Sequence, residues 1–149
     1  MSSLLLWGTV VSLSLFSILI LVLKNQGTQS FSEQTSEEVQ DLADKLRDSS
    51  KTLAVDIETT GLNFLTDLIQ TISISSHEQT WVIPLDHKDS PFRKGEPDYA
   101  QTWKCVRKIL ENPKGRKVFH NAKFDLKFLI NYGIFTKNVW DTKIMHHLL

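Results

Sequence analysis

The hydrophobic pattern divides the chain into an apolar leader, a short polar stretch and a longer region of alternating elements. The leader is residues 1–24, and its uncharged run at residues 4–23 is long enough to cross a membrane as a helix. It has neither the basic start nor the cleavage site of a secretory signal, so we interpret it as a membrane anchor; a non-native leader is the alternative. Lys24 favours a body on the cytoplasmic side of the membrane. Residues 25–35 are polar and predict a linker.

A helix is predicted directly after the linker. Thr35 and Glu38 have the spacing of a capping box, which marks a helix start. Apolar residues then recur at helical intervals through residues 36–48. The residues expected on the buried face are Val39, Leu42, Ala43 and Leu46.

The rest of the chain alternates between strand and helix patterns. The predicted elements are strands at Thr52–Asp56, Thr71–Ser75 and Thr80–Pro84, a helix from about Tyr99 to Glu111, a strand at Lys117–His120, a helix at Ala122–Tyr132, a short strand at Val139–Trp140 and a last helix after it. We expect Asn121 to cap the helix that it precedes. Three strands followed by strand–helix alternation predict an α/β fold with a mixed sheet flanked by helices.

Composition narrows the function only slightly. The chain has 17 basic and 17 acidic residues, but residues 1–50 carry three basic and six acidic ones, so the remainder carries 14 and 11, a net charge of +3. This mild excess permits a nucleic-acid partner without indicating one. Cys105 is the only cysteine, which excludes an internal disulfide and a cysteine-based zinc site, and we expect it to pack as a small apolar side chain.

Two pairs of polar residues are candidates for chemistry. Asp56 and Glu58 lie two positions apart at the end of an apolar strand, so their side chains point to the same face. Two adjacent carboxylates are favourable where a divalent cation lies between them, although two solvated acids at a strand end are the alternative. Asn121 and Asp125 lie on one face of the first turn of a later helix, where plain helix capping is the alternative. Together the three carboxylates indicate a candidate metal-dependent phosphoryl-transfer site.

Longer segments show a family resemblance. Asp-Ile-Glu-Thr-Thr-Gly-Leu at Asp56–Leu62 resembles the first motif of the DEDD exonuclease superfamily, and Asn-Ala-Lys-Phe-Asp at Asn121–Asp125 resembles the second. Three further segments are similar to the proofreading domain of family A DNA polymerases, namely Trp81–Leu85, Asn131–Ile134 and Trp140–Leu149. The resemblance spans about Phe31–Leu149.

The resemblance implies a fold and a metal site. It implies that residues 36–149 form a 3′→5′ exonuclease domain with a ribonuclease H-like mixed sheet. It also implies that Asp56, Glu58 and Asp125 bind two divalent cations, Mg²⁺ or Mn²⁺. In this assignment Asp56 contacts both ions, Glu58 contacts one, and Asp125 contacts the other.

The resemblance also implies contacts to the substrate. Thr59 and Leu62 would contact the terminal nucleotide, with Leu62 against its base, and Asn121 would hold the substrate. Asp141 is interpreted as a helix cap near the site. Basic residues around the site are candidates for phosphate contacts, with a solvated surface as the alternative; they are Lys104, Arg107, Lys108, Lys114, Arg116, Lys117, Lys123 and Lys127.

The function implied is hydrolysis of single-stranded DNA from the 3′ end to 5′-monophosphates, with a polymerase domain in the full-length parent. One alternative is a ribonuclease D-like enzyme that trims RNA. Another is a non-catalytic, membrane-tethered module that binds nucleic acid.

The third motif of the family is not found in the chain. That motif supplies a tyrosine and a fourth carboxylate in a Tyr-x-x-x-Asp arrangement, which neither Tyr99 nor Tyr132 begins. We therefore expect the fold to be incomplete at its C-terminal end and the chain to be part of a longer protein.

Without the third motif, these 149 residues should by themselves show little or no exonuclease activity. A nuclease assay on single-stranded DNA with Mg²⁺ measures this. Robust digestion by the 149-residue chain would contradict the expectation.

Overall fold

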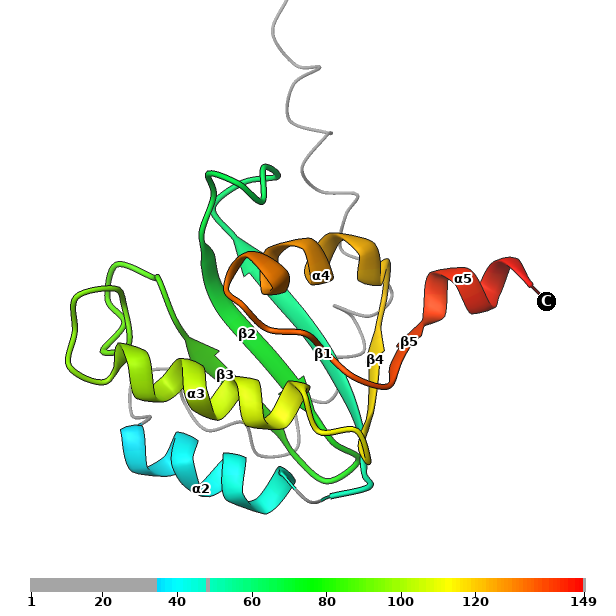
Figure 1. Cartoon of the computed structure of the whole chain (residues 1–149), viewed down its shortest axis with the longest axis horizontal. Helices are drawn as coiled ribbons and strands as arrows, with labels where there is room; N and C mark the ends of the chain where they lie inside the picture. Colours follow the sequence, from blue (N-terminus) through cyan, green and yellow to red (C-terminus); the bar gives the residue numbers. More distant parts are fainter. Residues whose placement is uncertain (1–34, 48, 149) are drawn as a thin grey trace, which may run out of the picture.

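The computed structural model describes residues 35–47 and 49–148 (Figure 1). The hydrophobic leader and nearly all of the linker lie outside the described residues, and so does the membrane-spanning helix expected there. Within the described part of the chain, no helix is both long enough and apolar enough to cross a membrane. The elements are the strands β1 (Thr52–Thr59), β2 (Ile69–Ser75), β3 (Thr80–Pro84), β4 (Arg116–Phe119) and β5 (Val139–Asp141), and the helices α2 (Ser36–Leu46), α3 (Tyr99–Leu110), α4 (Ala122–Asn131) and α5 (Thr142–His147).

The strands form one mixed sheet in the order β3-β2-β1-β4-β5. The first three strands are antiparallel neighbours, whereas β1, β4 and β5 run parallel to one another. This arrangement confirms the mixed α/β sheet expected from the order of the elements. It also places β1 at the centre of the sheet, where both of its edges are paired.

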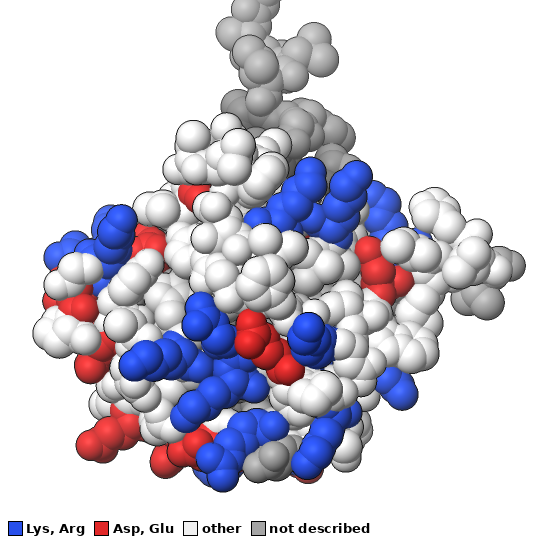
Figure 2. Space-filling model, in the orientation of Figure 1, with Lys and Arg blue, Asp and Glu red and all other residues white. Residues whose placement is uncertain are grey.

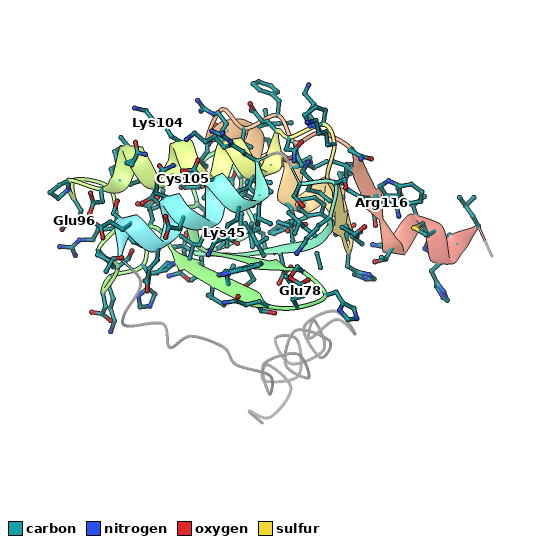
Figure 3. All side chains as sticks on the ribbon, turned by 90° about the horizontal axis from the view of Figure 1, so that it is seen from below. Lys45, Glu78, Glu96, Lys104, Cys105 and Arg116 are labelled. Carbon is teal, nitrogen blue, oxygen red and sulfur yellow. The ribbon has the colours of Figure 1, made fainter. Side chains whose placement is uncertain are left out.

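Helices α2 and α3 lie together on one side of the sheet (Figures 1 and 3). The capping box of α2 is present, and the four residues predicted for its buried face are all buried. The two helices are linked through Gln40, whose Oε1 accepts hydrogen bonds from Gln101 Nε2 at 2.6 Å and from Cys105 Sγ at 3.2 Å. Cys105 is buried between the helices, as expected for a small apolar side chain.

The central strand separates the core from the candidate chemistry. Leu53, Val55 and Ile57 of β1 are buried in the core, and the side chains between them point to the opposite face, where Asp56 is half-buried and Glu58 is exposed. The strand continues three residues beyond its expected end, because β2 pairs with it as far as Thr59. The two carboxylates therefore lie within a paired strand, which fixes their backbone positions better than a strand end would.

One expected phosphate contact is wrong. Lys117 of β4 is fully buried, and its Nζ donates hydrogen bonds to the backbone oxygens of Asn112 and Gly115, the latter at 2.8 Å. Burial lowers the pKa of Lys117 to about 8. Because its donors are used to hold the turn between α3 and β4, Lys117 does not contribute to a surface for nucleic acid.

Candidate active site

The three predicted metal ligands come from two elements that meet at the carboxyl end of β1. Asp56 and Glu58 lie two residues apart on one face of this strand. Asp125 lies in the first turn of α4, which crosses the strands near this end (Figure 1), and it is only 4% exposed. The charge of Asp125 interacts with that of Asp56, which interacts in turn with that of Glu58. The fold thus brings the two sequence motifs together.

Burial and neighbouring negative charges raise the pKa values of Asp56 and Asp125. Burial, and then the neighbouring charge of Glu58, raises the pKa of Asp56 to about 6. Burial, and then the charge of Asp56, raises the pKa of Asp125 to about 7, although backbone hydrogen bonds oppose the increase. A hydrogen-bonded acid at the surface would not behave in this way, because its charged form is well solvated. The solvated-acid alternative, stated for Asp56 and Glu58, therefore does not describe Asp56, whereas Glu58 is exposed.

The residues present suit a hard divalent cation. Carboxylate oxygens are the ligands that Mg²⁺ and Mn²⁺ prefer, and a cation would relieve the repulsion between Asp56 and Asp125. In residues 35–47 and 49–148, however, no group of three His, Cys, Asp or Glu side chains is placed so that it could hold a metal ion. The pair formed by Asp56 and Asp125 is therefore the centre of the candidate site, and Glu58 is its exposed neighbour.

A small cavity lies beside the N-terminal part of α4. Its volume is 190 Å³, and its lining residues are Leu62, Phe64, Asn121, Lys123, Phe124, Lys127 and Phe128. Two of the residues expected to contact substrate, Leu62 and Asn121, line this cavity, and Leu62 is 86% exposed. Thr59 does not line this cavity, and its hydroxyl donates a hydrogen bond of 2.6 Å to the backbone oxygen of Gly61. Two larger hollows, of 360 and 390 Å³, contain none of the expected site residues.

The start of α4 differs from the expected cap. Asn121 occupies the N-cap position, but its backbone is left-handed, with φ 64°, and its side chain makes no capping hydrogen bond. The Asp141 carboxylate instead accepts hydrogen bonds from the backbone N–H groups of Asn121 and Ala122, at 3.0 and 2.9 Å. It also accepts one from Lys143 N, and so caps α5. The bonds to Asn121 and Ala122 cannot be read from the sequence, because they join residues about 20 positions apart.

The basic residues fall into separate groups (Figure 2). Lys123 and Lys127 of α4 are exposed and line the cavity, and Lys127 Nζ lies 5.3 Å from the centre of the Phe64 ring. Arg116 instead lies over the Trp140 ring, at 4.6 Å. The exposed cations of α3 form a third group, consisting of Lys104, Arg107 and Lys108. Of these three groups, only the α4 pair lines this cavity, and none of the three carboxylates does.

Comparison with known proteins identifies the family. The 3′-5′ exonuclease family model matches residues 32–149 of the chain. The chain therefore belongs to the 3′-5′ exonuclease family, whose members are phosphodiester hydrolases. The match confirms the resemblance seen in the two motifs.

Individual relatives extend the comparison. DNA polymerase I of Aquifex aeolicus (strain VF5) is 37% identical over 119 residues, which are 80% of this chain and 17% of that protein. Escherichia coli RNase D, described as an exoribonuclease involved in structured RNA processing, shares the fold with a TM-score of 0.61 at 19% identity, over 80% of this chain and 28% of that one. Brucella melitensis NrnC with bound Mg²⁺ has a TM-score of 0.51 at 28% identity, over 68% of this chain and 46% of that one. The chain thus spans less than half the length of each of these relatives.

Asp125→Asn tests whether the buried carboxylates destabilise the fold at neutral pH in the absence of added metal. The folded-state pKa of Asp125, about 7, lies above its ordinary value of 3.8, so its charged form costs stability. This cost is absent below about pH 4 and complete above about pH 7. We expect wild-type stability to fall over this range, and Asp125→Asn to be more stable than wild type at about pH 8 by on the order of 2 kcal/mol. Urea unfolding at several pH values measures the difference.

Asp89→Asn is the matched control, because the Asp89 side chain is 74% exposed. Its stability should stay within about 0.5 kcal/mol of wild type at every pH. Added Mg²⁺ should stabilise the wild type at about pH 8 and have little effect on Asp125→Asn. If the free energy of unfolding depended on pH equally in wild type and Asp125→Asn, the raised pKa assigned to Asp125 would be wrong.

Proposed function

We propose that this chain provides the metal-binding part of a 3′→5′ exonuclease that hydrolyses single-stranded DNA from its 3′ end and releases 5′-monophosphates. The observation that carries the proposal is the pair of half-buried Asp56 and buried Asp125 at the carboxyl end of β1. The cavity at the start of α4, which Leu62 and Asn121 line, supports it, because a terminal nucleotide needs an apolar surface for its base.

In this proposal Asp56, Glu58 and Asp125 hold two divalent cations, Mg²⁺ or Mn²⁺. Two such ions, when bound, lower the pKa of an attacking water and neutralise charge on the phosphodiester. The chain itself orients the substrate. Leu62 offers an exposed apolar side chain to the terminal base, while Lys123 and Lys127 supply positive charge beside the same cavity for the phosphates.

The choice of DNA as the substrate rests on the relatives. Identity of 37% to a DNA polymerase I favours DNA, together with a polymerase domain and a proofreading role in the longer protein. A second candidate is RNA trimming, which the shared fold with RNase D favours. Phosphate contacts and base stacking do not by themselves separate the two, because separation requires recognition of the 2′-hydroxyl group.

Paired DNA and RNA oligonucleotides of one sequence test the proposal. With enzyme in excess and Mn²⁺ present, we expect slow shortening of 5′-labelled DNA from its 3′ end, and shortening of RNA at least about tenfold slower. Asp125→Ala should abolish cleavage, because the buried carboxylate of the proposed metal site is lost. Asp89→Ala is the control, since Asp89 is exposed and lines none of the described cavities.

Each outcome separates the candidates. Faster shortening of RNA would favour the trimming enzyme over proofreading. Oligonucleotide binding without cleavage, retained in Asp56→Ala, would favour a non-catalytic binding module. Cleavage that persists in Asp125→Ala, or that needs no divalent cation, would refute the proposed metal site.

A further inference from the structure

Two strand–helix junctions lie side by side at one edge of the sheet. β4 and β5 are parallel, and Phe119 at the end of β4 pairs with Asp141 at the end of β5. The chain leaves β4 to form α4 and leaves β5 to form α5, so the starts of both helices are neighbours. Asp141 is the only residue in residues 35–47 and 49–148 whose carboxylate accepts hydrogen bonds from the first N–H groups of both helices.

The hydrogen bonds to Asp141 give partners to backbone N–H groups at the start of α4. The first N–H groups of a helix have no partner within it, and Asn121 does not supply one from its own side chain. Asn121 also has a left-handed backbone, which asparagine adopts more readily than most residues other than glycine. Asp141 holds this turn by accepting from the N–H groups of Asn121 and Ala122, and its negative charge suits the positive end of the helix dipole.

Neighbouring side chains strengthen the same junction. The Thr142 hydroxyl donates to the backbone oxygen of Phe119 at 3.1 Å and lies 3.0 Å from His120 Nδ1. Lys143 Nζ donates to Asn121 Oδ1 at 3.3 Å. The segment Asp141–Lys143 therefore contacts every residue of Phe119–Ala122, the segment that connects β4 to α4. The α5 helix has no buried residue, so these contacts do little to anchor α5 in the core.

The junction matters because Asp125 lies in the first turn of α4. Its carboxylate is buried, and it lies four residues after Asn121, whose N–H group Asp141 binds. We propose that Asp141 is a positioning residue that fixes the start of α4 through its hydrogen bonds to Asn121 and Ala122, so that Asp125 faces Asp56. This inference rests on the proposed function and assigns to Asp141 a part in it beyond capping a helix.

Asp141→Ala tests the inference, with Thr35→Ala as the matched control. Thr35 is the N-cap of α2 and accepts a hydrogen bond from Glu38 N, far from the carboxylates in the sequence and on a different element. Both substitutions remove a helix cap and should lower stability. Only Asp141→Ala should raise the Mn²⁺ concentration at half-saturation, by about tenfold or more, and slow single-turnover cleavage by about 10–100-fold, with oligonucleotide affinity changed less than about threefold.

The measurements are Mn²⁺ titration by electron paramagnetic resonance and cleavage with excess enzyme, at a temperature where all variants are folded. Asp141→Asn retains one acceptor oxygen and should recover part of the lost Mn²⁺ affinity and part of the lost cleavage rate. The same variant replaces Asp141→Ala in the test if Asp141→Ala does not fold. Wild-type Mn²⁺ binding and cleavage in Asp141→Ala would overturn the inference while leaving the proposed function intact. A wild type that neither binds Mn²⁺ nor cleaves would refute the proposed function, and the positioning role with it.

Discussion

The proximity of two carboxyl groups with raised pKa values, half-buried Asp56 and buried Asp125, is the constraint on which the candidate site depends. Asp56 and Asp125 belong to different elements, and their charges raise the cost of bringing β1 and α4 together. Such an arrangement persists only when the rest of the fold determines it strongly. In the proposed function these carboxylates are half of a site whose other half is a cation. A fold selected for stability alone would place apolar or hydrogen-bonded neutral side chains at these positions.

Two parts of the fold hold the carboxylates in place, one on each side. β1 is paired along both edges, and Leu53, Val55 and Ile57 anchor it in the core while Asp56 points to the other face. The second side is the start of α4, which is bound through backbone hydrogen bonds to the neighbouring junction rather than through its own N-cap. Paired strands on one side and hydrogen bonds on the other fix where the two carboxyl groups lie, and fixed ligands are the condition for binding a metal ion tightly and in one geometry.

The sequence predicted what depends on local pattern. The buried face of α2 follows from helical spacing, and the shared face of Asp56 and Glu58 follows from strand alternation. The details that it missed depend on partners distant in the chain. β1 extends to Thr59 because β2 pairs with it. Lys117 is the exception, because its partners are carbonyl oxygens of the adjacent turn, at Asn112 and Gly115; it is buried there although a lysine pattern normally indicates a surface. The contact of Asp141 with the start of α4 exists only once β4 and β5 pair.

The proposed function requires that a divalent cation bind between β1 and the start of α4. A crystal soaked in MnCl₂, with diffraction data collected at the manganese absorption edge, would locate such an ion. We expect an anomalous peak within coordination distance of carboxylate oxygens from both Asp56 and Asp125. Ordered carboxylates with no peak between them, or a peak only at another place on the protein, would contradict it.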